Sequence, residues 1–430
     1  MDVHVVSKTN NNTHAAFRLP TPTTPLAPSS IRVQPSLLGL TSNNLTYALL
    51  GDMLHWWDTY PLPPNTPAPY NDRTAWGIVP AWGFATVLSS TIPDLPRGTT
   101  IWGYWPASGH IVDLALEHRG ADPESHWVEV SPHRKTVLEL YNRYIVLESP
   151  ARDETRAAWE SVMRPLWQCG YMMAEYVLTH DPASKPPIHP LPGLPSVKAE
   201  WTARDADVRK TVIVSLGASS KTGRSFAHNL ALRPGGKGPL GFLQVTSAPG
   251  GIQVAVEALG VGFASRAVDY EELKEGKEVA EWIVGLKPER ILVFDFGSRD
   301  GGWESLNALV KGSEELSGVE LLTLNVGYQQ KVYTLEDVGA AMASAEEHGK
   351  VQLNTSPIIS AAFELQGAVK VFAGLEEHWD HWVKNQQAVA PDLKIVWGEG
   401  VVGEKGIEGG WTRLTKGGVR PEEALVYRIP

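Results

Sequence analysis

The sequence predicts an α/β protein that combines a β-rich domain with a doubly wound parallel-sheet domain. The chain has 430 residues, which is more than one hydrophobic core usually serves. Short β-type runs broken by Gly, Pro, Asn and Asp extend from about residue 36 to 130, and strand and helix patterns alternate from 211 to 326. These observations indicate two domains, or one domain inserted in another.

The first 35 residues mix Asn, Thr, Pro and Ser. They lack the continuous apolar stretch of a secretory signal, so we expect a solvated lead-in with an edge strand at residues 17–19. Short runs such as 77–80 and 99–104 then predict a loop-rich β domain. Several of the 16 tryptophans fall between Trp56 and Trp105. They predict either an irregular β core or an aromatic pocket.

Apolar residues take helical spacing over residues 152–179. The pattern predicts a helical hairpin that is interrupted near Pro165 and Gly170. The proline-rich residues 181–195 then predict an exposed connection.

Regular alternation starts at residue 211. The predicted strands are 211–216, 240–246, 267–268, 290–294 and 319–326, and the predicted helices are 222–232, 252–259, 275–284 and 303–310. Each crossover must pack back onto the sheet with one hand, so this alternation indicates a parallel sheet that is covered on both faces.

The remaining chain shows an apolar segment at 358–363, a helix at 376–388, and strands at 394–397 and 424–429. We expect this tail to return to the first domain and complete its sheet. No internal repeat is visible.

Composition excludes several classes of function. The net charge is −10 with scattered Lys and Arg, so we expect no nucleic-acid partner. No run approaches the roughly 20 apolar residues of a membrane span, so no membrane partner is expected. The single cysteine, Cys169, excludes an intrachain disulfide and a zinc site with two or more thiolates. A reducing, cytoplasmic location and a small-molecule substrate are expected, and a homodimer stays open.

The turn after the first strand of the alternating region predicts a diphosphate site. It comprises Gly217-Ala218-Ser219-Ser220-Lys221-Thr222-Gly223. Small residues let the backbone approach a diphosphate, whose oxygens the amides of the next helix can bind. A phosphate-loop NTPase requires four residues between its glycines and then a lysine, whereas here five residues and an arginine occur. The alternative is a glycine-rich turn that binds nothing.

The residues that follow the other strands indicate which dinucleotide is expected. Thr246 and Ser247 follow the second strand, where an acidic residue would hold the ribose of NAD, so NADP(H) is favoured over NAD(H). Small-residue turns follow two later strands and predict nicotinamide-side contacts. These turns are Asp295-Phe296-Gly297-Ser298 and Asn325-Val326-Gly327-Tyr328.

Motifs along most of the chain carry a family resemblance. They are Leu40-Thr41-Ser42-Asn43-Asn44-Leu45-Thr46-Tyr47, Gly51-Asp52, Val79-Pro80-Ala81-Trp82-Gly83-Phe84-Ala85, Trp102-Gly103-Tyr104-Trp105-Pro106, Tyr141-Asn142-Arg143-Tyr144, Ala218-Ser219-Ser220-Lys221-Thr222, Leu259-Gly260 and Val268-Asp269-Tyr270. In these the chain resembles the fungal and bacterial DUF2855 family. That family is similar to zinc-free, quinone-reductase-like medium-chain dehydrogenases/reductases.

The resemblance implies a GroES-like catalytic domain over residues 36–154 and 351–430, and a Rossmann domain over 155–350. It implies NADP(H), no metal, and reduction of a carbonyl or conjugated double bond. Tyr270 joins the cofactor candidates, and Asn44, Tyr47, Asp52 and Trp57 are the substrate-binding candidates. One departure is that Ser220 and Lys221 stand where quinone reductases carry glycines.

Tyr141 and Tyr144 are the candidate catalytic residues, because a phenol can donate to a developing enolate or alkoxide. Their spacing on a helix would equally fit an anchor at a domain interface. His55 is a titratable neighbour of Trp56, or a structural histidine. The alternatives to a reductase are an isomerase or non-redox accessory protein of a biosynthetic pathway, and a scaffold with a relic Rossmann fold.

Overall fold

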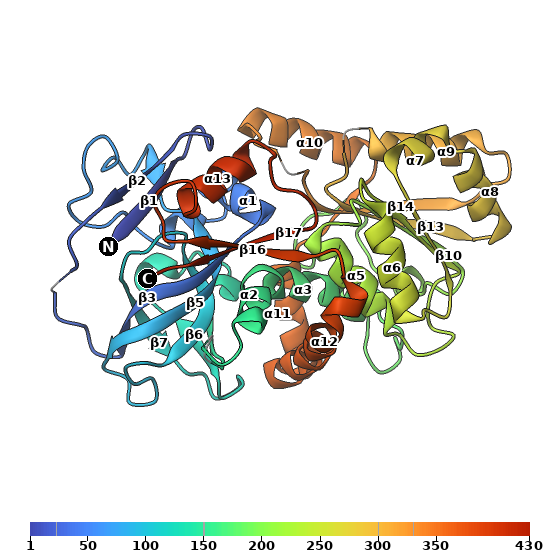
Figure 1. Ribbon diagram of the computed structural model, residues 1–430. Helices are drawn as coiled ribbons and strands as arrows, with labels where there is room; N and C mark the ends of the chain where they lie inside the picture. The colour runs from blue at the N-terminus through green and yellow to red at the C-terminus, as the bar shows by residue number, and fades with distance from the viewer. Residues whose placement is uncertain (23, 149–150, 300, 330) are drawn as a thin grey trace. The chain divides into compact units, whose positions relative to one another are not determined.

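A computed structural model describes residues 1–22, 24–148, 151–299, 301–329 and 331–430 (Figure 1). The chain forms two compact units. The first unit comprises Met1–Pro165, Gln330–Val338 and Lys394–Pro430, and the second comprises Leu166–Gln329 and Gly339–Leu393. The first is built on mainly antiparallel sheets, with one parallel pair of strands, and the second on a parallel sheet, so the predicted α/β class is confirmed.

The main sheet of the first unit is a barrel with an extension. β3 pairs with β5 on one side and with β7 on the other, so the order β3-β5-β6-β9-β8-β7 closes on itself. β17 pairs antiparallel with β3, and β16 lies beyond it. The strands are β3 (Ser30–Leu40), β5 (Pro80–Ser90), β6 (Thr100–Pro106), β7 (Val112–Glu117), β8 (His126–Glu129), β9 (Arg143–Val146), β16 (Lys394–Glu399) and β17 (Glu423–Arg428).

A small second sheet contains the N-terminal residues. It has the order β2-β1-β4, with β1 (Asp2–Ser7), β2 (His14–Arg18) and β4 (Trp76–Gly77). The expectation of a solvated lead-in is therefore wrong for these strands. Val3, Val5 and Val6 are completely buried, because β1 lies between two antiparallel partners. The polar residues that suggested solvation belong to the connecting turns.

The helices of the first unit are short. They are α1 (Ser42–Leu49), α2 (Glu154–Val162) and α13 (Ile407–Thr415), with 3-10 turns η1 (Trp56–Asp58), η2 (Pro132–Arg134) and η3 (Glu139–Asn142). α2 packs on β3, β5 and β17. It thereby covers the outside of the barrel where the C-terminal strand joins.

The second unit contains a parallel sheet with the order β12-β11-β10-β13-β14-β15. Numbered from its own first strand, the order is 3-2-1-4-5-6, which is the order of dinucleotide-binding domains. The strands are β10 (Thr211–Leu216), β11 (Gly241–Val245), β12 (Ala264–Val268), β13 (Arg290–Phe296), β14 (Glu320–Gly327) and β15 (Val351–Gln352). The predicted parallel sheet is confirmed, and its order reverses between β10 and β13.

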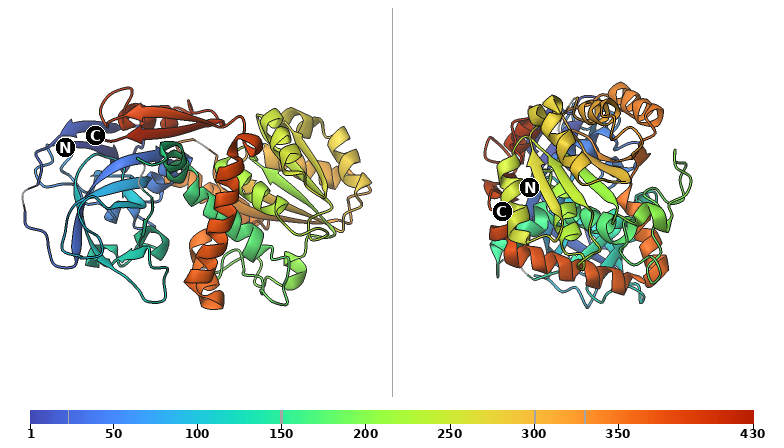
Figure 2. Two further views of the ribbon diagram at one scale, coloured as in Figure 1. Left: turned by 60° about the horizontal axis from the view of Figure 1, so that its bottom comes forward. Right: turned by 90° about the vertical axis from the view of Figure 1, so that its right-hand side faces the viewer.

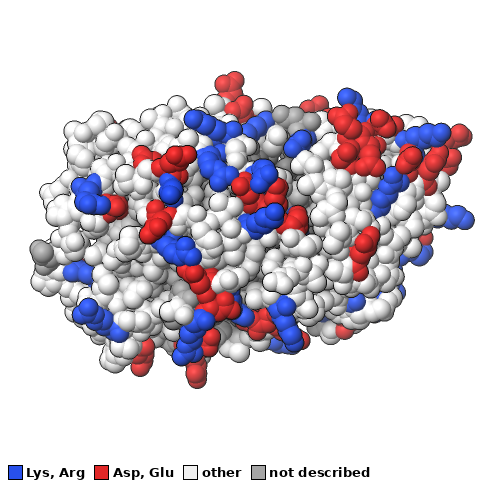
Figure 3. Space-filling view, viewed as in Figure 1, with Lys and Arg blue, Asp and Glu red and all other residues white. Residues whose placement is uncertain are grey.

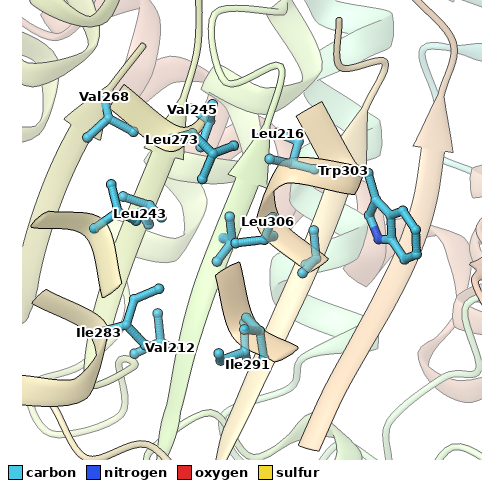
Figure 4. Close-up of a cluster of buried hydrophobic side chains, with 14 of the residues drawn as sticks. Val212, Leu216, Leu243, Val245, Val268, Leu273, Ile283, Ile291, Trp303 and Leu306 are labelled. Atoms are coloured by element: carbon cyan, nitrogen blue, oxygen red, sulfur yellow. The ribbon is translucent and has the colours of Figure 1, made fainter. Parts of the chain in front are cut away.

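Helices follow each strand of this sheet. They are α5 (Lys221–Ala231), α6 (Pro249–Leu259), α7 (Tyr270–Glu275), α8 (Lys277–Gly285), α9 (Gly302–Gly312), α10 (Leu335–Glu347), α11 (Thr355–Gln366) and α12 (Ala368–Val389), and the short α4 (Ala203–Ala206) precedes β10. Leu216, Leu243 and Val293 on one face of the sheet pack with Ile283 of α8 and Leu306 of α9 (Figure 4). On the other face Phe226 of α5 contacts Phe242 and Phe294. This double coverage explains why the central strands β10, β11 and β13 are buried along their whole length.

The predicted helical hairpin is a broken helix. α3 (Arg164–Met172) continues into a π-helical turn, η4 (Met173–Val177), and the break from α2 lies at Met163, next to the predicted Pro165. Gly170 does not interrupt α3, contrary to the prediction. A Cβ at this position would lie 2.2 Å from Ser225 Oγ, so the glycine instead allows α3 to approach α5.

Two surface properties bear on the predicted partners. Basic and acidic side chains are interspersed over the described residues in Figure 3, with acidic groups where α7 to α9 lie. No single helix in the described ranges is long and apolar enough to cross a membrane. The pair α11 and α12, bent by 117°, passes that test together by length and composition only.

Core packing gives the first testable prediction. Leu243 is completely buried, so Leu243→Ala should destabilise the protein by about 2–5 kcal/mol through lost burial and a cavity. Leu365 is 41% exposed, and Leu365→Ala, the matched control, should cost less than about 0.5 kcal/mol. Urea unfolding measures both. Equal losses would contradict the burial of β11 in this core.

Candidate functional site

The turn from Gly217 to Gly223 lies at the carboxyl edge of the parallel sheet. Gly217 directly follows the central strand β10 and has φ +73°, which favours glycine. Ser220 caps α5, because its Oγ accepts the amide of Gly223 at 3.0 Å. Ser220, which stands where quinone reductases carry a glycine, therefore serves as the N-cap of α5. First-turn amides of a helix lack intrahelical acceptors, so this turn offers donors to an anion.

The individual residues of the turn differ in exposure. Ala218 and Ser219 are buried, and the Ala218 amide donates to Val245 O at 3.0 Å. Gly217, Ser220, Lys221 and Thr222 are half-buried, whereas Gly223 is buried. The exposed part of the turn is therefore the start of α5.

A salt bridge between Arg224 and Asp392 holds the turn in place. The Arg224 guanidinium donates to both carboxylate oxygens of Asp392, at 3.0 and 2.5 Å, and its Nε donates to Ser219 O at 3.2 Å. The Asp392 carboxylate also lies against Gly251, in the first turn of α6. This pair therefore holds the first turns of α5 and α6 in a fixed relation, since a bidentate pair has a defined geometry.

The switch point of the sheet is adjacent to the turn. A Cβ on Gly217 would lie 3.3 Å from Gly297 O, so the chain segments after β10 and β13 touch. Asp295, at the end of β13, accepts hydrogen bonds from the amides of Gly297 and Ser298 at 3.1 and 2.8 Å. Burial raises the pKa of Asp295 in spite of these bonds. Ligands of open parallel sheets bind where the strand order reverses. Here the turns after β10 and β13 form the two sides of that place, and hydrogen bonds fix both turns.

The other predicted cofactor residues of this unit lie at the same edge. Thr246 is completely buried, with its Oγ1 accepting from Ala248 N at 3.2 Å, and Ser247 is exposed. Tyr270 follows β12, and its hydroxyl accepts from Arg299 N at 3.3 Å.

The ends of β13 and β14 hold the remaining cofactor candidates. Asn325 Nδ2 donates to Gln352 Oε1 at 3.0 Å, and Gly327 ends β14. The Phe296 side chain points into the core against Phe226, so Phe296 offers only its backbone to the edge.

These observations fit a dinucleotide. The donor set is neutral or cationic, the half-buried residues are small or hydroxylated apart from Lys221, and the 11-residue helix α5 begins at the turn. A diphosphate needs amide and hydroxyl donors at a helix N-terminus, which residues 217–223 provide.

An aromatic cluster forms the interior of the first unit. Tyr141 is half-buried, and its ring centroid lies 4.8 Å from Tyr104, 5.4 Å from Trp56, and 5.9 Å from both Tyr47 and Trp82. The Tyr47 hydroxyl accepts from Trp82 Nε1 at 3.0 Å. The Tyr104 hydroxyl is buried without a hydrogen-bond partner among the described residues. An unpaired buried hydroxyl is costly, so Tyr104 is an unusual member of this cluster.

Tyr144 belongs to a separate, closed network. Its hydroxyl donates to Tyr104 O at 3.0 Å, accepts from Arg134 Nη2 at 3.0 Å, and lies 2.9 Å from the Tyr60 hydroxyl. Burial raises the pKa of Tyr60 and Tyr144, so both stay protonated. The helical spacing considered for the two tyrosines does not occur, because Tyr141 lies on η3 and Tyr144 on β9.

The other substrate candidates are dispersed in the first unit. Asn44 is 2% exposed, closes the capping box of α1 with Thr41, and donates to Pro80 O at 2.8 Å. Asp52 is exposed and pairs with Lys8 at 3.4 Å, and Trp57 is buried below that lysine. His55 Nδ1 lies 2.9 Å from Asp58. Of the candidates, only Tyr47 lies with Tyr141.

The structure adds residues that sequence reasoning missed. Tyr60 and Arg134 complete the network around Tyr144, and the dense aromatic run between Trp56 and Trp105 was the available signal. Arg224 and Asp392 are 168 positions apart, so no local pattern could reveal their pairing. Within the described residues, no group of three or more His, Cys, Asp or Glu side chains is arranged to hold a metal ion.

A family model described as "Protein of unknown function (DUF2855)" matches residues 38–420. No curated protein matches the chain.

Solved structures of the same fold cover the whole chain. CurA from Vibrio vulnificus in complex with NADPH has a TM-score of 0.55 at 10% identity, over 100% of this chain and 99% of CurA. The Etr1p/NADP/crotonyl-CoA complex has 0.54 at 10%, over 99% of each chain. A mutant enoyl thioester reductase from Candida tropicalis has 0.52 at 11%, over 99% of each chain. These similarities establish the fold as that of medium-chain dehydrogenases/reductases, with a GroES-like and a Rossmann domain.

The buried network around Tyr144 yields a stability prediction. The Arg134 and Glu129 side chains are each 1% exposed, with Nε and Oε2 3.9 Å apart. Arg134→Met should destabilise the protein by about 3 kcal/mol, because it leaves a buried carboxylate without its cation. Arg119 forms an exposed pair with Glu139, and Arg119→Met should change stability by about 0.5 kcal/mol or less. Chemical unfolding compares them, and a loss below about 1 kcal/mol for Arg134→Met would exclude this role.

Proposed function

This chain belongs to the DUF2855 family, and we propose that it is an NADP(H)-dependent reductase of a small, apolar or polyketide-like molecule. The proposed reaction reduces a carbonyl or a conjugated double bond and requires no metal. The observation that carries it is the turn 217–223 at the point where the parallel sheet reverses its order.

The printed descriptions of the similar structures support this choice. CurA was solved with NADPH, and Etr1p with NADP and crotonyl-CoA, which is a conjugated thioester. We propose the same cofactor and an electrophile of that kind for this chain. When bound, NADPH supplies a hydride to the substrate carbon and leaves as NADP⁺, and a proton completes the reduction.

The chain's own residues would hold the cofactor as follows. The first-turn amides of α5 and the Thr222 hydroxyl bind the diphosphate, with Lys221 contributing charge. Thr246 and Ser247 lie at the ribose position without a carboxylate, which favours a 2′-phosphate. Gly297, Asn325 and Gly327, at the ends of β13 and β14, line the nicotinamide side.

Tyr141 is the residue that we propose as proton donor. It is the half-buried member of the aromatic cluster, whereas the Tyr144 hydroxyl is enclosed by three protein groups. Tyr144 then acts as a positioning residue, because it holds the Tyr104 backbone beside Tyr141. Tyr47 and Trp56 provide an apolar wall for the substrate.

Cofactor binding is tested by a substitution that introduces a negative charge in the turn 217–223. Thr222→Glu places a carboxylate beside the proposed diphosphate, and the repulsion should weaken NADPH binding by about 2 kcal/mol, roughly thirtyfold. Acidic residues stabilise helix N-termini, so the melting temperature should not fall. Isothermal titration calorimetry gives the affinity.

Thr222→Gln is the matched neutral control: it also loses the hydroxyl contact but adds no charge, so its NADPH affinity should stay clearly above that of Thr222→Glu. If the wild-type protein takes up no NADPH or NADH, or if Glu and Gln behave alike, the proposed cofactor site is wrong.

The role of Tyr141 is tested by the rate of NADPH oxidation over a panel of enones, ketones and crotonyl thioesters. Tyr141→Phe should lower kcat about a hundredfold with the best substrate, because the proton donor is lost. The affinity for NADPH should stay unchanged. Tyr144→Phe should chiefly lower stability, by about 1–2 kcal/mol.

NADPH that is bound but never consumed across this panel would support the non-redox accessory protein or isomerase instead. An unchanged kcat in Tyr141→Phe would remove this tyrosine from the proposal.

A further inference from the structure

A cavity lies at the amino edge of the parallel sheet, opposite the turn 217–223. Its volume is about 470 Å³, and its lining includes Thr211, Arg290 and Glu320, the first residues of β10, β13 and β14. The proposed cofactor turn follows the last residue of β10, so the two sites occupy different edges. The volume lies within the range of small-molecule sites.

Arg233 is a buried cation of this cavity without an ion-pair partner among the described residues. It is 9% exposed. Its Nη2 donates to the carbonyls of Ala174, at 2.7 Å, and Leu178, and its Nη1 donates to Lys237 O at 3.4 Å. Its buried Nε has no hydrogen-bond partner in the described residues. Burial lowers the pKa of Arg233 to about 10, although the Glu175 and Asp207 carboxylates oppose this shift.

Arg290 is a second such cation. It is 5% exposed, and its guanidinium donates to Asp207 O at 2.6 Å, to Arg204 O at 3.3 Å and to the Thr211 hydroxyl. Backbone carbonyls orient these guanidinium groups but carry no net charge. Buried charges normally have a counter-charge, whereas neither guanidinium forms an ion pair within 4.0 Å with a carboxylate of the described residues.

Most of the nearby carboxylates pair with other cations, and the exposed Asp181 on the lining accepts from the Ser184 hydroxyl at 2.6 Å. Asp207 pairs with Arg209 at 2.6 Å, and Glu320 with Arg204 at 3.3 Å. Glu289 pairs with Lys210 at 2.5 Å, and Glu175 with Lys185 at 3.0 Å. The lining as a whole has six Lys and Arg against four Asp and Glu, in a chain whose net charge is −10. The positive charge is therefore local to this cavity.

We propose that this cavity binds a small organic anion through phosphate or carboxylate oxygens. The free Nε of Arg233 donates to the anion, and the exposed Lys237 at the rim attracts it. Buried His180 Nδ1, also on the lining and without a partner among the described residues, provides a further polar contact. Guanidinium groups bind both types of oxyanion, so the shared chemistry defines the ligand class.

The test is calorimetric titration of the full chain at low ionic strength, with pyrophosphate and with citrate as probes. Lys237→Glu reverses the rim charge on an exposed residue, so the fold should be retained. The variant should weaken binding about tenfold or more. Lys277→Glu makes the same charge change on α8, outside the lining, and should alter the affinity by about twofold or less.

The choice of probe identifies the source of the anion. Tighter binding of pyrophosphate indicates a phosphate ligand, and tighter binding of citrate a carboxylate. No binding of either probe at millimolar concentration would overturn the proposal, as would equal affinities of wild type and Lys237→Glu.

Titrations with and without saturating NADPH separate this site from the proposed cofactor site. Anion binding should persist with NADPH present, and displacement would show that the probe occupies the turn after β10. If NADPH does not bind, the proposed function fails, whereas the anion titration remains a test of this cavity.

Discussion

The parallel sheet of the second unit requires cover on both faces, because its strands are apolar on both sides and have little polar surface to expose to water. α7 to α9 cover one face and α5 the other, and this cover forces every connection to leave at the carboxyl edge and return at the amino edge. The turns that join strands and helices of this sheet therefore lie at its two edges. The carboxyl edge holds the small-residue turn, and the amino edge holds the cavity with its buried arginines.

The two edges have different chemistry because their donors differ. At the carboxyl edge the donors are backbone amides, and the Arg224 guanidinium is already neutralised by Asp392. At the amino edge the guanidinium groups of Arg233 and Arg290 bond to carbonyls and retain their charge. The first edge therefore suits a ligand that needs many weak donors, and the second suits a compact anion. In the first unit, Arg134 likewise keeps buried phenols and a carboxylate in place.

Much of the second unit was predictable because a buried parallel sheet leaves a strong sequence pattern. The strand 211–216 was predicted with its observed bounds, whereas β12 is longer than the predicted 267–268, because polar residues interrupt its apolar run at Ser265 and Arg266. The edge strand expected at residues 17–19 overlaps β2, whereas β1 was missed, since three valines in a polar surrounding are too few to outweigh the composition around them.

Side-chain pairings were less accessible to sequence reasoning. Tyr141 and Tyr144 were singled out together from the sequence, but their different surroundings depend on Tyr60, Trp56 and Arg134, which come from other elements. The link between Arg224 and Asp392 joins residues that are distant along the chain, and no periodicity records such a contact. Whether a hydroxyl is exposed depends on contacts between residues that are distant in the sequence. The sequence could therefore suggest candidate tyrosines for the site, but not which of the two is enclosed by other protein groups.

The central claim is that the first-turn amides of α5, in the turn 217–223, bind the diphosphate of NADP(H). Hydrogen–deuterium exchange of the full chain with and without NADPH measures those amides directly. The account predicts that NADPH slows exchange in peptides covering Gly217 to Arg224. Saturation with NADPH that leaves those peptides unchanged, while protecting amides elsewhere, would contradict it.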